Sequence, residues 1–311
     1  APPIDSGGGM NIALTGGTGF IGSHFLKQAL AAGHTLRAIR RNHSSQTRIP
    51  IDQQPVWLDC QLDEVAAEEL HGCEVLVHLA AHTGNVPYDS LASCLRWNLM
   101  AVLDLFEQAR LAGIRRFVVA GSCFEYGRSA ERYESIPTDA PLEPTNSYAA
   151  SKAAASIALC QWAQEHQLSL EILRVFHVFG EGEAETRFWP SLRRAALAGE
   201  DLPMTEGEQI RDFMPVEAVA RTFLDRVSLP VPSASLVQVF NLSSCEPISI
   251  RCFAKRWWNH WDAKGSLLFG RVSYRNGEVM RYVAGEKLIY VDKIKMPCKW
   301  TASADSFLEK L

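Results

Sequence analysis

Three residues of this chain could together move a proton to or from a carbonyl oxygen. Tyr148 and Lys152 are four positions apart in a stretch typical of a helix, so both project from one face. A tyrosine can act as the acid if an ammonium lowers its pKa from about 10, and we expect Lys152 to do so. Ser122 follows the apolar run 117–121 and could stabilise a developing alkoxide. The three residues predict a site for hydride transfer, although tyrosine–lysine pairs and strand-end serines also occur by chance.

A glycine-rich turn supplies a place for the hydride carrier. Gly16, Gly19 and Gly22 follow the apolar run 12–14 and open a second apolar stretch typical of a helix. Glycines at this spacing allow a sharp turn and a close approach to a pyrophosphate, which the first N–H groups of the helix would bind. The segment predicts a dinucleotide site; the other interpretation is a tight turn without a ligand.

The residues at the end of the second strand bear on which dinucleotide binds. A site for NAD usually carries an acid about 20 residues after the glycines, whereas an arginine suits the 2′-phosphate of NADP. Arg40 and Arg41 end the run 35–40, and no acid lies between Gly22 and Asp52. We therefore expect NADP(H), with Arg40 and Arg41 at the phosphate; two solvated arginines at a strand end are the alternative.

The elements that must position these residues alternate between strands and helices. Strands are expected at 11–15, 35–40, 55–58, 74–79, 116–121 and 170–175, and helices at 20–32, 64–70, 91–112 and 147–167. Such alternation predicts an α/β fold of the Rossmann type, a doubly wound parallel sheet, over residues 10–180. Residues 181–311 are expected to form a smaller substrate-binding lobe interwoven with that domain, and residues 1–9 resemble a cloning remnant before a native Met10.

Composition excludes several other classes of protein. The net charge of −4 over 311 residues gives no basic field for nucleic acid or an anionic membrane. No apolar run approaches the ~18–20 residues of a membrane span. The eight cysteines lack C-x-x-C spacing, and neither histidines nor acids are spaced as metal ligands. With no export signal, we expect a reducing cytoplasm and no metal.

Taken together, these motifs resemble the extended short-chain dehydrogenase/reductase superfamily, in its nucleotide-sugar epimerase, dehydratase and reductase branch. The similarity runs from Met10 to the end and rests on 15–22, 77–81, 122–127, Tyr148 with Lys152, 174–180 and 207–213. It implies Ser122, Tyr148 and Lys152 as the catalytic residues. It also implies a set of residues around the cofactor: Gly16, Thr18, Gly19, Phe20, Ile21, Gly22, Arg40, Arg41, Asp59, Cys60, Leu79, Ala80, Ala81, Asn98, Tyr148, Lys152 and His177.

The resemblance further implies where a sugar nucleotide would bind. Arg211 and Arg275 match arginines that hold its base or diphosphate, and bidentate guanidinium–phosphate pairing explains arginine at such places. Ser122, Cys123 and His177 complete the implied substrate contacts. His177 replaces the usual asparagine of its motif, and we leave open whether it donates to the substrate or is a buried imidazole.

One departure from the branch narrows the expected reaction. Dehydratases carry Asp-Glu directly after the strand-end hydroxyl residue, and Cys123 and Phe124 stand at these places. Simple dehydration is therefore not expected. The residues of these motifs are most similar to those of NADPH-dependent reductases of 4-keto-6-deoxy sugar nucleotides. This similarity predicts a nucleotide-sugar 4-ketoreductase of deoxysugar biosynthesis.

Two other functions stay open at this point. A nucleotide-sugar 4-epimerase would retain NAD, against which Arg40 counts, and a non-catalytic NADP-binding sensor would not need the Ser/Tyr/Lys set. The resemblance also suggests a homodimer formed through helices 91–112 and 147–167. The base of the sugar nucleotide and the configuration of the product hydroxyl are not predicted.

Overall fold

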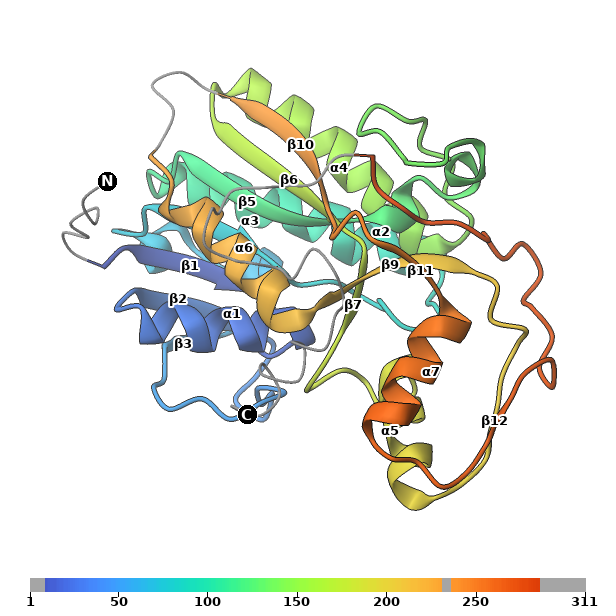
Figure 1. Cartoon of the computed structure of the whole chain (residues 1–311). Coiled ribbons are helices and arrows are strands. Elements are labelled where there is room, and N and C mark those ends of the chain that lie inside the picture. Colours follow the sequence, from blue (N-terminus) through green and yellow to red (C-terminus); the bar gives the residue numbers. More distant parts are fainter. Residues whose placement is uncertain (1–8, 231–235, 286–311) are drawn as a thin grey trace, which may run out of the picture.

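The structure is a computed structural model that describes residues 9–230 and 236–285. Its centre is a seven-stranded, wholly parallel sheet (Figure 1). In spatial order the strands are β10 (Val237–Leu242), β6 (Ser169–Val175), β5 (Arg116–Ser122), β4 (Val75–His78), β1 (Asn11–Thr15), β2 (Thr35–Arg40) and β3 (Val56–Asp59). The Rossmann-type α/β fold expected from the sequence is confirmed.

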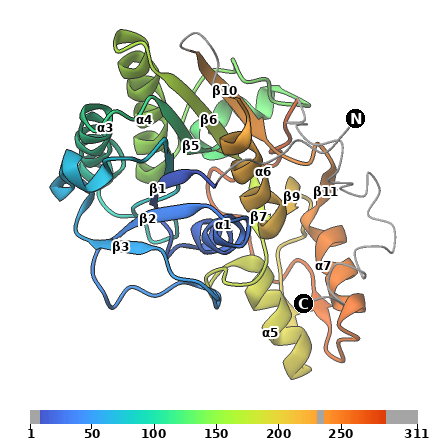
Figure 2. The same ribbon diagram turned by 90° about the vertical axis from the view of Figure 1, so that its left-hand side faces the viewer.

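The sheet is covered by helices on both faces, which explains its continuous apolar strands. All seven residues of β6 are buried, without the alternation of a half-exposed strand. Helices α1 (Phe20–Ala31) and α6 (Val216–Ser228) pack on one face, and α3 (Ala101–Leu111) and α4 (Ser147–Glu165) lie on the other (Figure 2). Each face thus has its own apolar core.

The order of the strands fixes where a ligand can bind. From β1 the chain adds β2 and β3 on one side and then returns to place β4 on the other side of β1. The helices that follow β1 and β4 therefore lie on opposite faces, and a crevice opens at the carboxyl ends of these two strands. Thr15 ends β1 and pairs in register with His78, which ends β4.

The last third of the chain contributes to the sheet and also builds a smaller lobe. β10 pairs with β6, and α6 packs against α1. The lobe holds β7 (His177–Phe179), β9 (Ile210–Pro215) and β11 (Pro247–Ser249) in one sheet, and β8 (Leu202–Pro203) with β12 (Leu267–Leu268) in another. Helices α5 (Phe188–Ala198) and α7 (Ile250–His260) stand beside these strands (Figure 1). Aromatic side chains fill the core of the lobe; Phe213 stacks on Phe253 with ring centroids 4.0 Å apart.

Two expected helices differ from the structure. The helix expected at 64–70 is wrong, because this stretch forms two short 3-10 turns, Leu62–Glu64 and Ala67–Leu70. The carboxylates of Glu64 and Glu69 each accept the N–H three residues earlier, so each acid caps its own turn. The stretch 91–112 is helical but contains α2 (Leu91–Leu95), a π-helical turn at Arg96–Met100, and α3. Within the described residues, no helix combines the length and apolarity needed to cross a membrane.

Candidate active site

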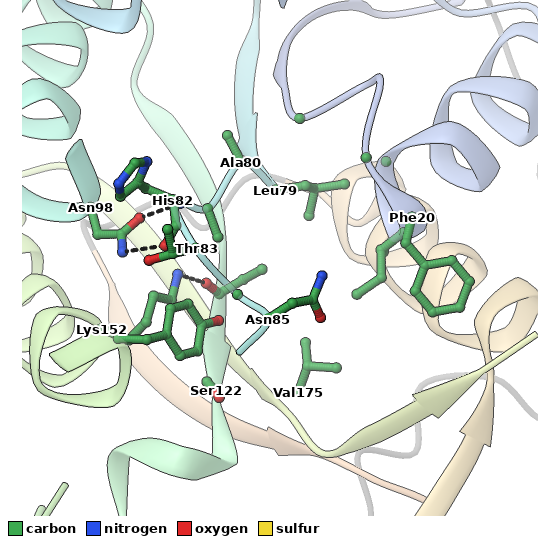
Figure 3. A pocket seen from close by; sticks show the side chains of 18 of the residues that line it. Phe20, Leu79, Ala80, His82, Thr83, Asn85, Asn98, Ser122, Lys152 and Val175 are labelled. Atoms are coloured by element: carbon green, nitrogen blue, oxygen red, sulfur yellow. Dashed lines mark hydrogen bonds between the residues drawn. The ribbon is translucent and has the colours of Figure 1, made fainter. Parts of the chain in front are cut away.

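A cavity of about 770 Å³ occupies the crevice at the carboxyl ends of β1 and β4. Its walls come from the glycine loop, the segment after β4, the end of β5 and lobe residues between 182 and 187. Figure 3 shows Ser122 and Lys152 on one side of this cavity and Phe20 on the other. The described residues contain no cluster of three side chains suited to a metal ion.

The glycine loop has the geometry of a diphosphate cradle. Gly16 has a φ of +76°, and a Cβ there would lie 2.5 Å from the amide nitrogen of Ala80. A Cβ on Gly22 would lie 1.8 Å from the carbonyl oxygen of Gly16. No side chain caps the first N–H groups of α1, which begins at Phe20 on the cavity wall. Free N–H groups at a helix N-terminus bind anions, so the loop fits the pyrophosphate of a dinucleotide.

Ser122, Tyr148 and Lys152 all line this cavity. Ser122 is the last residue of β5, and the side chain of Asn146 caps α4 so that Tyr148 lies in its first turn. The ring of Tyr148 stacks on Tyr88, with centroids 5.9 Å apart. The Lys152 ammonium, one turn further along α4, donates to the carbonyl oxygen of Ala120 at 2.7 Å (Figure 3). The two elements bring the three predicted residues to one cavity.

The protonation of these groups differs from the expectation. Burial raises the pKa of Tyr148, and the charge of Glu125 adds to the rise, while Arg187 acts against it. Burial lowers the pKa of Lys152, and Glu125 opposes that shift. The expected lowering of the Tyr148 pKa is not seen, because burial outweighs the nearby charges; an effect of the Lys152 ammonium on Tyr148 stays a prediction. Tyr148 keeps its phenolic proton, which is the form that can donate to a carbonyl oxygen.

Arg40 lies at the cavity but is already engaged. Its Nε lies 2.5 Å from Oδ1 of Asp59, and its guanidinium lies 4.5 Å from the ring centre of Trp57. The hydrogen bond from Arg40 lowers the pKa of the exposed Asp59 carboxyl. Arg41 and Arg48 also line the cavity, whereas Asp59 is not among its described lining residues. Arg48 was not predicted, because it sits in an irregular loop with no recognisable motif.

The other residues expected at the cofactor line the same cavity: Thr18, Gly19, Ile21, Cys60, Leu79, Ala80, Ala81 and Asn98. Asn98 lies in the π-helical turn, and its amide binds both the backbone N–H and the carbonyl of His82 (Figure 3). The same amide donates to Ser151 on α4 at 2.9 Å. Asn98 therefore ties the segment after β4 to the helix that carries Tyr148.

Cys123 and His177 also reach the cavity, at the side next to the lobe. Burial raises the pKa of the Cys123 thiol, so it stays protonated. His177 is half-buried among Phe124, Phe213 and Tyr282, and desolvation lowers the pKa of its imidazole. The imidazole is therefore neutral, and its Nδ1 is buried without a partner among the described residues.

The two arginines expected at the sugar nucleotide lie elsewhere. Arg211 is buried and forms an ion pair of 2.9 Å with Glu278, and Arg275 is exposed. Neither is among the described residues that line the cavity. Arg187, just before α5, does line it, with its Nε 3.6 Å from Oε1 of Glu183. Burial raises the pKa of Glu183 to about 7. Sequence reasoning missed both residues because the loop that carries them has no regular pattern.

The comparison with protein families agrees with this geometry. Residues 12–228 match the NAD dependent epimerase/dehydratase family, well over half of the chain. The protein belongs to this family.

Members of the family with curated names differ in reaction. The chain is 26% identical over 262 residues to the UDP-glucose 4-epimerase of Corynebacterium glutamicum, covering 78% of each protein. It is 28% identical over 254 residues to the dTDP-6-deoxy-L-talose 4-dehydrogenase (NAD(+)) of Aggregatibacter actinomycetemcomitans, covering 78% of this chain and 87% of the relative. Among solved structures, MoeE5 in complex with UDP-glucuronic acid and NAD superposes with a TM-score of 0.75 and 27% identity, over 88% and 89% of the two chains. The names of these relatives refer to nucleotide sugars. The comparison therefore supports the conclusion that the protein is an enzyme, but it does not identify which reaction the protein catalyses.

Proposed function

We propose that the protein reduces the 4-keto group of a nucleoside-diphosphate 4-keto-6-deoxyhexose with NADPH. The observation that carries the proposal is that one cavity holds Ser122, Tyr148 and Lys152 while Cys123 and Phe124 follow Ser122. A buried, protonated thiol and a phenyl ring cannot act as the acid and base of a dehydration. Reduction needs only a hydride and one proton, and the residues present can deliver that proton.

The proposed step assigns one role to each residue. A reduced nicotinamide dinucleotide bound along the glycine loop would supply the hydride to the ketone carbon. Tyr148 gives its phenolic proton to the ketone oxygen as negative charge develops there. The Ser122 hydroxyl donates a hydrogen bond that orients the same oxygen. Lys152 holds a positive charge beside the site and stabilises the tyrosinate that remains until solvent returns the proton.

Support for NADPH comes from the end of β2. Arg40, Arg41 and Arg48 line the cavity, and the first acid after Gly22 is Asp52. Guanidinium groups suit a 2′-phosphate, whereas an acid would repel it. Two of the named relatives point to NAD instead, because NAD is bound in MoeE5 and written in the name of the talose dehydrogenase. The preference between NADPH and NADH is therefore tested by measuring the affinity for each cofactor.

Support for the sugar comes from relatives and from charge. One relative is named as a 4-dehydrogenase of a dTDP-6-deoxyhexose, which is redox chemistry at the same carbon. The protein carries a net charge of −4, so a substrate with a diphosphate needs local cations. Arg187 lines the cavity beside the lobe and is our candidate for the diphosphate. Arg211 and Arg275, proposed from the resemblance, would have to act from outside the described cavity wall.

Incubation of the pure protein with NADPH and a panel of nucleoside-diphosphate 4-keto-6-deoxyhexoses tests the proposal. A reductase oxidises one NADPH for each ketone consumed, followed at 340 nm and by chromatography of the sugar nucleotide. Interconversion of 4-epimers without net NADPH consumption would replace the proposal with an epimerase. Tight NADPH binding without turnover of any sugar would favour the non-catalytic NADP-binding sensor.

A further inference from the structure

Glu125 is a buried carboxylate directly behind the proposed catalytic serine. It lies three residues after Ser122, in the short turn that follows β5, and its side chain is fully buried. Its Oε1 accepts the backbone N–H of Ser122 at 2.8 Å, and its Oε2 accepts Nε of Arg174 at 2.9 Å. Both carboxylate oxygens are thus bound, and one of them holds the backbone of Ser122.

Arg174, the partner of Glu125, is itself fixed by the central sheet. It lies on β6, its Nη1 donates to the hydroxyl of Tyr126 and to the carbonyl of Thr138, each at 2.9 Å, and its guanidinium lies over the Tyr126 ring. The Tyr126 hydroxyl in turn donates to Asn241 on β10 at 2.6 Å. A hydrogen-bonded chain therefore runs from the end of β5 across β6 to β10. Such a buried, fully bonded network keeps Glu125 in one position.

The charge of Glu125 also lies near the other two groups of the site, because its Oε1 binds the N–H of Ser122 while Nζ of Lys152 binds the carbonyl oxygen of Ala120, two residues earlier on β5. It raises the pKa of both Tyr148 and Lys152, so it favours the protonated form of each. The remaining charged and titratable groups that face these residues are Cys123, Tyr88 and Arg187 around Tyr148, and His78 beside Lys152. Around Glu125 itself lie Arg174, Tyr126, Cys123 and Cys160.

We infer that Glu125 is a positioning residue of the reductase site: it anchors the backbone of Ser122 and supplies the negative charge that faces Tyr148 and Lys152. The inference rests on the proposed function for its effect on catalysis. It acts through Ser122, Tyr148 and Lys152 and does not need contact with the substrate.

Two substitutions separate the anchor from the charge. Glu125→Gln keeps an oxygen for the Ser122 N–H and removes the charge, whereas Glu125→Ala removes both. Because Glu125→Gln leaves the Arg174 cation unpaired in the interior, the double variant Glu125→Gln/Arg174→Gln provides a neutral pair. Glu171 is the matched control, since it is a buried carboxylate that binds Arg226 through two hydrogen bonds of 2.6 and 2.8 Å but does not line the cavity. Glu171→Gln and Glu171→Ala lose the same kind of interaction away from the site.

The variants are compared by steady-state kinetics from pH 6 to 10 and by hydrogen exchange of the peptide that contains Ser122. Without the Glu125 charge, deprotonation of Tyr148 or Lys152 becomes easier. The alkaline limb of kcat therefore moves to lower pH, by roughly one unit, in Glu125→Gln, whichever of the two groups titrates first. In the double variant the shift is smaller, because the Arg174 cation is lost together with the Glu125 charge. In Glu125→Ala, kcat falls by about 100-fold with an unchanged KM for NADPH, and the Ser122 amide exchanges about 10-fold faster. The Glu171 variants keep the wild-type pH profile and the wild-type exchange at Ser122.

The inference is overturned if Glu125→Gln keeps the wild-type pH profile or if Glu125→Ala leaves the exchange of Ser122 unchanged. It is also overturned if the Glu171 variants change both readouts to the same extent, because the effect is then general loss of stability. Wild-type protein that reduces no 4-keto sugar refutes the proposed function instead. The exchange measurement then still decides whether Glu125 anchors Ser122, because it needs no substrate.

Discussion

At the scale of single residues, the proposed chemistry depends on one phenolic proton. Tyr148 lines the cavity, and its raised pKa keeps it protonated over the working pH range. Tyr148→Phe should lower kcat by roughly 100-fold or more, the usual contribution of a positioned acid, and leave the affinity for NADPH nearly unchanged. Tyr88→Phe is the matched control, because Tyr88 stacks on Tyr148 and loses the same hydroxyl. Equal activity of the two variants would remove Tyr148 from its role.

A second prediction at this scale concerns the choice of cofactor. Arg40 and Arg48 both line the cavity. Arg40 forms an ion pair with Asp59, whereas Arg48 has no ion-pair partner among the described residues. Arg48→Ala should therefore lower the affinity for NADPH by about 10- to 150-fold, which corresponds to ~1.5–3 kcal/mol for a charge-assisted contact. The affinity for NADH, measured by fluorescence titration, should not change, and the exposed Arg221→Ala serves as the control. An equal loss for both cofactors would show that Arg48 does not contact the 2′-phosphate.

At the scale of elements, the glycine loop depends on packing between backbones. A Cβ at position 22 would lie 1.8 Å from the Gly16 carbonyl oxygen, but at position 19 the nearest atom would be 3.1 Å away. Gly22→Ala should destabilise the protein by ~1–3 kcal/mol, as overpacking usually does, and abolish dinucleotide binding. Gly19→Ala should fold with near-wild-type stability. Urea unfolding with and without NADPH measures both effects, and equal stability of the two variants would contradict the close approach of α1 to the loop.

The elements also show how far the sequence could be interpreted. The strands that build the cavity were predicted within about one residue, because buried parallel strands are continuous apolar runs. The stretch 64–70 was misassigned because Glu64 and Glu69 cap separate short turns, an arrangement that competes with one helix. β10 was not predicted because it is not a continuous apolar run; polar residues interrupt it, and its first four residues are only half-buried. The role of Glu125 depends on pairing with Arg174, and only the fold brings these two residues together.

At the scale of the whole molecule, we expect the proposed substrate to contact the lobe across the cavity. Arg187→Ala should raise the KM of the sugar nucleotide, by about 10- to 150-fold for a lost charge-assisted contact, and spare that of NADPH. Arg211→Ala should mainly lower stability, because it leaves the Glu278 carboxylate without its buried partner. Kinetics with both substrates varied and urea unfolding separate these outcomes. If Arg211→Ala raises the KM for the sugar nucleotide and leaves stability unchanged, Arg211 and not Arg187 is the residue that binds the diphosphate.

The pH dependence of stability follows from a carboxyl group in the same loop. Glu183 has a side chain only 7% exposed, and its Oε2 has no hydrogen-bond partner among the described residues. Burial raises its pKa from 4.5 to about 7, so the folded protein holds this proton more tightly than the unfolded chain does. Stability is therefore lost as the pH rises from about 4.5 through 7, by on the order of 3 kcal/mol from this group.

Glu183→Gln should remove that contribution and make the protein more stable than the wild type at pH 8 but not at pH 5. Glu185→Gln is the matched control, because Glu185 lies two residues away with a side chain 80% exposed. Urea unfolding of the three proteins from pH 5 to 8 gives the differences directly, and groups that titrate in all three cancel. If Glu183→Gln and the wild type lose stability in parallel as the pH rises, Glu183 is already ionised in the fold. Its ion pair with Arg187 would then offset the cost of burial, and Arg187 would be less available to a diphosphate.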